Sequence, residues 1–158
     1  MIKKYWLIPL FVWGLAPFGW AADTRVIAER FPLSLEVEGF SIRAGKVMND
    51  QGASNGKAVF SDSINFSAKI IVIFNETGEY RLTLWEKTTA GNKDSVHIRV
   101  NHNPSIRTYP QAASYGVYAP CIKTAPIIIN QPGDVTITIF TTNEYGSFYD
   151  KVVIDKIK

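Results

Sequence analysis

Residues 78–101, GEYRLTLWEKTTAGNKDSVHIRVN, are the stretch that decides the fold. Apolar side chains recur at every second position in two runs, Tyr80, Leu82 and Leu84, then Val96, Ile98 and Val100. This alternation is typical of strands with one buried face and one wet face. The polar segment between the runs contains Gly91 and Asn92 and predicts a turn. We therefore predict an antiparallel hairpin here, with the rest of the chain forming further strands around it.

Strand patterns also occur on both sides of this stretch. Residues 70–74, IIVIF, predict a strand buried on both faces, and residues 48–57 predict a turn-rich loop. Residues 127–129 and 135–139 flank a turn and predict a second hairpin, and a last strand should run from about Phe148 to Ile157. Because we find no amphipathic helix in the mature chain, the sequence predicts an all-β fold, a two-sheet antiparallel β-sandwich of the jelly-roll type.

The N-terminus has the pattern of a secretory signal. Lys3 and Lys4 precede an apolar run that ends in small residues, so we predict a signal peptide over residues 1–21. The alternative is a retained membrane anchor, but the run is shorter than the roughly 20 residues of a span and contains Pro9 and Pro17. We expect a secreted or periplasmic protein, with residues 22–34 as an extended lead-in and 35–158 as one domain.

Charge and cysteine content narrow the choice of partners. The full chain has 17 basic and 14 acidic side chains, and removing Lys3 and Lys4 leaves the mature chain almost neutral. No predicted strand concentrates Lys and Arg, which argues against binding nucleic acid. Cys121 is the only cysteine and is unable to form an intramolecular disulfide, although pairing between two chains stays open. We expect a monomer without a membrane span after the signal is removed.

The sequence does not indicate an enzyme. His97 alternates with apolar residues on a strand, and His102 lies in a loop without a serine or cysteine motif. Glu36 and Glu38 are neighbours on one predicted strand face, whereas a glycosidase places its two carboxylates on opposite sides of the scissile bond. No glycine-rich phosphate loop and no Cys/His metal cluster is present in the sequence.

Five short motifs occur in an order that resembles the carbohydrate-binding modules of families 6 and 35. They are LEVE at 35–38, GASNGKAV at 52–59, GEYRLTL at 78–84, DSVHIRV at 94–100 and YDKVVI at 149–154. The resemblance spans about residues 35–157. It implies a galactose-binding-domain-like jelly roll, a structural calcium ion, and a sugar site formed by loops at one end of the sandwich.

The resemblance implies that Glu36, Glu38 and Asp150 hold the calcium ion. Two carboxylates on one strand face repel each other unless a cation lies between them, and calcium takes carboxylate and carbonyl oxygens. The alternative is three solvated acids on an exposed edge. The chain departs from the family at Phe148, because an asparagine that contacts sugar often occupies this position.

The leading hypothesis is a non-catalytic module that binds a polysaccharide or glycan. Sugar recognition needs aromatic faces and nearby polar groups, which the proline-rich segment 101–126 supplies through Tyr109, Tyr115, Tyr118 and Asn103. The tyrosines could instead pack this segment onto the sandwich. The second hypothesis, which Phe148 favours, is an extracellular or envelope interaction protein that keeps the fold without a sugar site.

Overall fold

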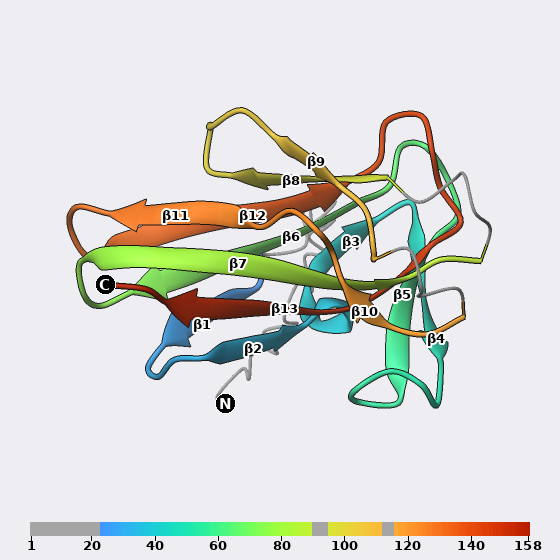
Figure 1. Ribbon diagram of the computed structural model, residues 1–158, viewed down its shortest axis with the longest axis horizontal. Coiled ribbons are helices and arrows are strands. Elements are labelled where there is room, and N and C mark those ends of the chain that lie inside the picture. The colour runs from blue at the N-terminus through green and yellow to red at the C-terminus, as the bar shows by residue number, and fades with distance from the viewer. Residues whose placement is uncertain (1–22, 90–94, 112–115) are drawn as a thin grey trace, which may run out of the picture.

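The computed structural model, which describes residues 23–89, 95–111 and 116–158, consists of two β-sheets packed face to face (Figure 1). The first sheet has the order β1-β6-β12-β8-β9, with β3 also paired to β6. Its strands are β1 (Arg25–Ala28), β3 (Ser41–Arg43), β6 (Ser67–Phe74), β8 (Val96–Val100), β9 (Ile106–Thr108) and β12 (Gly133–Phe140).

The second sheet has the order β10-β7-β13-β5-β4, with β11 also paired to β7 and β2 to β13. Its strands are β2 (Leu33–Glu36), β4 (Gly45–Asn49), β5 (Lys57–Ser61), β7 (Gly78–Lys87), β10 (Ala119–Pro120), β11 (Ala125–Ile129) and β13 (Phe148–Lys156). In the described ranges the one helical element is the 3-10 turn η1 (Val37–Gly39). The predicted all-β two-sheet sandwich is confirmed.

The core lies between the two sheets and follows the alternation in the sequence. Leu82 and Leu84 on β7 of the second sheet and Ile137 and Ile139 on β12 of the first are fully buried and belong to one core cluster. Burial of one such side chain contributes about 1.5–3 kcal/mol. The outward residues of β6 are only half-buried in the part of the chain that the structure describes, so the prediction that residues 70–74 are buried on both faces was wrong.

The predicted hairpin at 78–101 was also wrong. β7 pairs with β10, β11 and β13 in the second sheet, whereas β8 pairs with β9 and β12 in the first. The pair predicted at 127–139 separates in the same way, with β11 and β12 in different sheets. Alternation identifies which face of a strand is buried, but it does not identify the neighbouring strand. Two consecutive strands with apolar inner faces fit the pattern whether they pair in one sheet or lie in opposite sheets across the core.

The N-terminal segment joins the sandwich. Residues 25–28, expected to be part of an extended lead-in outside the core, form β1, which runs parallel to β6 and buries Ala28. The predicted signal peptide lies outside the described residues. Within the described ranges, no helix has the length and apolar character needed to cross a membrane.

Candidate functional site

Several loops gather at one end of the sandwich, on the right in Figure 1. They are the β4–β5 loop within the second sheet, and the β5–β6 and β12–β13 connections between the sheets. Hydrogen bonds tie the end of β5 to the β12–β13 connection: Gly146 N donates to the Ser61 carbonyl at 2.9 Å, and Ser61 N donates to the Ser147 carbonyl at 3.0 Å. We call this end of the molecule the loop end.

The three acidic residues of the predicted calcium site all reach the β4–β5 loop. The Asp150 Oδ1 atom accepts from the Ser54 amide at 2.8 Å and lies 2.9 Å from the Ser54 hydroxyl. This same hydroxyl lies 2.7 Å from Glu36 Oε2, and Asn55 donates to Glu38 Oε1 at 2.9 Å. A hydroxyl carries one proton, so Ser54 donates to only one of its two carboxylate neighbours at a time.

The structural elements that carry the two glutamates differ from the sequence prediction. β2 ends at Glu36, and Glu38 lies in η1, so the two glutamates do not share a strand face. Among the described residues, Glu38 Oε2 is buried without a hydrogen-bond partner, and none of the three acids has an ion-pair partner. As they stand, no three His, Cys, Asp or Glu side chains among the described residues form a group that could hold a metal ion.

Tyr118 belongs to a second cluster at the loop end. Its hydroxyl donates to Asp50 Oδ2 at 3.0 Å, and Asp50 also forms an ion pair with Lys87. The Lys87 ammonium lies 4.8 Å from the centre of the Tyr118 ring and 4.6 Å from that of Phe148. Burial raises the pKa of Tyr118, with the Asp50 hydrogen bond as a further cause, so the phenol stays protonated. Tyr118 therefore makes its contacts inside the protein, in agreement with the alternative that the tyrosines pack segment 101–126 onto the sandwich.

The Asp50–Lys87 pair should make stability depend on pH. The Lys87 hydrogen bond is the main cause of the lowered pKa of Asp50, so the pair stabilises the fold above the unfolded-state pKa of about 3.9 and loses this effect as pH falls through the lowered value. We expect Asp50→Asn to cost about 1.5–3 kcal/mol at pH 7 and less at pH 3, measured by urea unfolding.

Asp62→Asn provides the control for this measurement, because the Asp62 pair with Lys46 at 3.0 Å is exposed on the lysine side. Exposed pairs contribute about 0–1 kcal/mol. If Asp50→Asn lost the same stability at pH 7 and at pH 3, the negative charge of Asp50 would not be the cause of the stabilisation.

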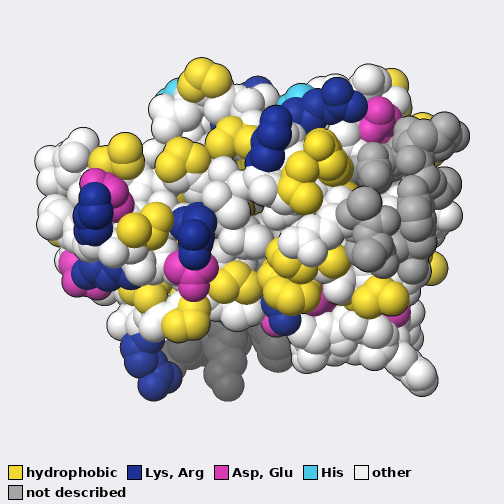
Figure 2. All heavy atoms as spheres, viewed as in Figure 1, with side chains coloured by type: hydrophobic (Ala, Val, Ile, Leu, Met, Phe, Trp, Pro, Cys, Tyr) yellow, Lys and Arg dark blue, Asp and Glu magenta, His cyan; other side chains and the backbone are white. Residues whose placement is uncertain are grey.

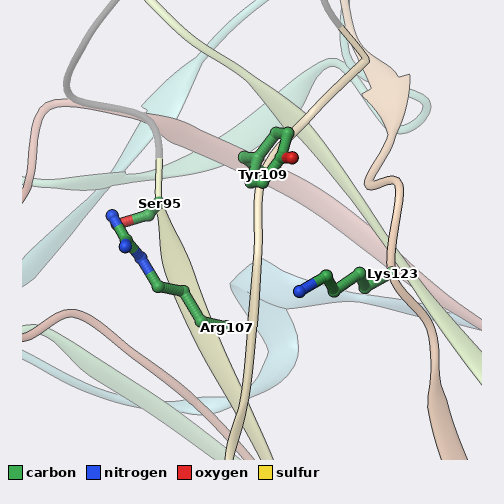
Figure 3. Close-up of a pocket in the computed structure, with 4 residues that line it drawn as sticks. All are labelled: Ser95, Arg107, Tyr109 and Lys123. Atoms are coloured by element: carbon green, nitrogen blue, oxygen red, sulfur yellow. The ribbon is translucent and has the colours of Figure 1, made fainter.

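Tyr109 lies in a different environment, beside a hollow with a volume of about 330 Å³ (Figure 3). Its side chain is 43% exposed, and the other described lining residues are Ser95, Arg107 and Lys123. In the surface view, Lys and Arg side chains lie beside hydrophobic side chains over β9 (Figure 2). An exposed aromatic ring next to a concave surface with a few polar groups is the arrangement of a small-ligand site.

The backbone around this hollow is fixed by a short pairing between residues 108–110 and 121–123, which we call the clasp. The Thr108 hydroxyl accepts from Lys123 N at 2.9 Å and donates to the Lys123 carbonyl at 3.1 Å. Ile122 N donates to the Tyr109 carbonyl at 2.9 Å, and Pro110 forms a bridge with Cys121. Because one side of the clasp follows β9 and the other follows β10, it joins the edges of the two sheets and holds Tyr109 and Lys123 in place.

The structure separates the remaining predicted ligand residues. Asn103 lies in the turn between β8 and β9, at the opposite end of β9 from Tyr109 (Figure 1), so the two do not form one site. Tyr115 lies outside the described residues. His97 packs on Phe140 with ring centres 5.2 Å apart, and its nitrogens lie 3.4 and 3.3 Å from the hydroxyls of Ser105 and Thr142.

Comparison with solved structures identifies the fold. A family 35 carbohydrate-binding module from Clostridium thermocellum matches with a TM-score of 0.62 and 21% identity, over 78% of this chain and 98% of the module. The chain has the fold of a family 35 carbohydrate-binding module. No protein-family model matches the sequence, and no curated protein matches it.

Two further matches are an isolated module and part of an enzyme. The family 35 module from Paenibacillus barcinonensis gives a TM-score of 0.63 at 19% identity, over 77% of this chain and 97% of the module. The exo-β-1,3-galactanase from Phanerochaete chrysosporium, solved with galactose, gives 0.64 at 21% identity, over 77% of this chain. Our chain spans only 29% of the galactanase but nearly all of the isolated modules, so its match is to a module rather than to a whole enzyme.

Sequence reasoning missed three residues at the hollow of this family 35 fold. Ser95 and Lys123 join Tyr109 only because the clasp and the start of β8 bring distant segments together. Arg107, two residues before Tyr109, could have been found from the sequence. It alternates with Ile106 and Thr108, and this pattern predicts that its side chain lies on the exposed face of β9.

Proposed function

We propose that the protein is a secreted, non-catalytic module that binds a polysaccharide or glycan at the Tyr109 hollow. The observation that carries the proposal is the exposed Tyr109 ring beside a hollow of about 330 Å³. Pyranose rings have an apolar face that stacks on aromatic side chains, and their hydroxyls bond to nearby polar groups. The solved family 35 modules of the same fold support the choice of a sugar over another small ligand.

An ordered backbone also supports this location. Ser95 lines the hollow, and its amide donates to the Glu144 carboxylate at 2.7 Å. Because the clasp fixes the backbone on either side of Tyr109, the ring needs little further ordering when it binds.

The test is binding to a panel of immobilised and dissolved polysaccharides, with the Tyr109→Ala variant measured beside the wild type. We expect Tyr109→Ala to lose about 1–2 kcal/mol of binding free energy, or roughly 5- to 30-fold in affinity. Tyr145→Ala is a matched control, because Tyr145 is 45% exposed and does not line the hollow. It should bind like the wild type.

No binding by the wild type to any polysaccharide would contradict the proposal. It would favour an extracellular interaction protein, for which the exposed side chains of Ile122, in the clasp, and Val117, two residues before β10, would be the first surface to probe. Equal losses in the Tyr109 and Tyr145 variants would place the site elsewhere.

We also propose a structural calcium ion held by Glu36, Glu38 and Asp150. The support is chemical: three carboxylates meet at Ser54 and Asn55 without a cationic partner in the described chain, and Glu38 Oε2 is buried without a hydrogen bond. Calcium takes carboxylate, carbonyl and amide oxygens, which these residues and the loop supply. Bound there, it would neutralise charge that the single Ser54 proton leaves unbalanced.

A further inference from the structure

Strand β4 ends the second sheet with an exposed edge. Among the described residues it pairs only with β5, and in Figure 1 it lies at the right-hand margin of the sandwich. Apolar side chains on both of its faces reach solvent, since Val47 is 49% and Met48 is 42% exposed. A row of unpaired backbone groups on such an edge is a template for pairing with another strand.

The register with β5 identifies the backbone groups of β4 that are free to pair. Asp50 N donates to the Gly56 carbonyl at 3.0 Å, and hydrogen-bonded pairs recur at every second residue of an antiparallel ladder. Lys46 and Met48 therefore bond to β5. The alternate residues direct their amides and carbonyls away from β5, and no hydrogen bond within the described ranges uses these groups; the residues are Gly45, Val47 and Asn49.

The other edges of the two sheets are protected against such pairing. Proline has no amide donor, and Pro126 lies within β11 and Pro120 within β10. The edge strands β1, β2, β3 and β9 have no more than four residues each, and short edges offer few groups to a partner. In the described part of the chain, β4 is therefore the longest edge strand without a proline.

We propose that β4 pairs with β4 of a second copy of this chain, antiparallel and across a two-fold axis at Val47. An isologous contact of this kind uses the same surface on both copies. Val47 exchanges backbone hydrogen bonds with its counterpart, and Gly45 does so with Asn49 of the second copy, because these are the residues with outward groups. The inference does not depend on sugar binding, and it gives a dimer in place of the monomer expected from the sequence.

The side chains of β4 suit this self-pairing. On the face that Val47 shares with the buried Val59, the two Val47 side chains meet. On the other face, Met48 lies opposite Lys46 of the second copy, so that the lysine stem packs on an apolar side chain. Lys46 is the only charged residue of β4 and keeps its pair with Asp62 at 3.0 Å. Like charges therefore do not face each other across the axis.

The test is the mass of the purified protein in analytical ultracentrifugation from about 10 µM to about 1 mM, because an interface of one short strand is small and its dimer weak. We expect the mean mass to rise from monomer toward dimer over this range. Val47→Lys should lower the association constant about tenfold, because it places two ammonium groups opposite each other at the axis. Ile128→Lys is the matched control, since Ile128 is 67% exposed on β11, and it should associate like the wild type.

Amide hydrogen exchange of the wild type tests the inference even if Val47→Lys unfolds β4. The Val47 and Asn49 amides should exchange several-fold more slowly in the concentrated sample than in the dilute one, whereas the Met48 amide is protected in both. A monomer mass at every concentration would overturn the inference, and so would unchanged association in Val47→Lys. Protection of the Val47 amide in the dilute monomer would also overturn it, because another segment of the same chain would then cover the edge.

Discussion

Phe66→Ala should lower the free energy of unfolding by about 3–5 kcal/mol, as expected for a buried aromatic side chain cut back to a methyl group. Phe66 is 1% exposed and stacks on Tyr149 with ring centres 5.0 Å apart. It lies directly before β6, where the chain crosses from the second sheet to the first. Its backbone carbonyl also accepts from Thr141 N at 3.2 Å, so the residue supports the β12–β13 connection.

Chemical denaturation measures this loss, with Phe148→Ala as the control. Phe148 is also an aromatic residue at the loop end, packed on Phe60 with ring centres 4.8 Å apart, but it is only partly buried. We expect a clearly smaller loss in Phe148→Ala than in Phe66→Ala. A loss below about 1.5 kcal/mol in Phe66→Ala would mean that the contact with Tyr149 does not anchor the loop end.

Excess calcium should raise the thermal midpoint of the wild type above its value in a chelator. An ion that binds only the folded chain stabilises it by about 2.7 kcal/mol at a hundred times its dissociation constant. Asp150→Ala should abolish this shift, because Asp150 is the most buried of the three carboxylates proposed to hold the ion. The variant should also be less stable in the chelator, since the Ser54 amide loses its acceptor.

Asp155→Ala separates this effect from a general loss of charge on β13. Asp155 lies five residues further along the strand and faces Arg81 at 3.8 Å on the surface, away from the β4–β5 loop. It should keep the full calcium shift. Equal midpoints of the wild type in calcium and in chelator would refute the calcium proposal, and so would a shift that persists in Asp150→Ala.

Sequence alternation predicted the strands and their buried faces well, because the burial of a side chain depends on which face it lies on. Tyr80, Leu82 and Leu84 are buried as the pattern required. The partners of β7 and β8 were not predictable in the same way, since a polar connection permits a crossing between sheets as readily as a tight turn. The order of short motifs, rather than the periodicity, carried the information about topology.

The candidate site was predictable only in part. Glu36 and Asp150 both contact Ser54, and no local sequence pattern shows this. Tyr109 and Tyr118 looked equivalent in the sequence, and only their partners distinguish them, an open hollow for one and Asp50 for the other. Lys123 carries no sequence signal, because its place at the hollow comes from the pairing of its backbone with Thr108.

The clasp has a consequence for how such a protein could diversify. The clasp holds Pro110 and Cys121 together through a β-bridge, so the two ends of the chain segment between them are fixed. Lengthening a closed loop costs little, about 0.6 kcal/mol for each doubling. Insertions between positions 111 and 117, which precede Tyr118 and β10, could therefore accumulate while both sheets stay intact, so that this stretch of the surface evolves separately from the stability of the scaffold.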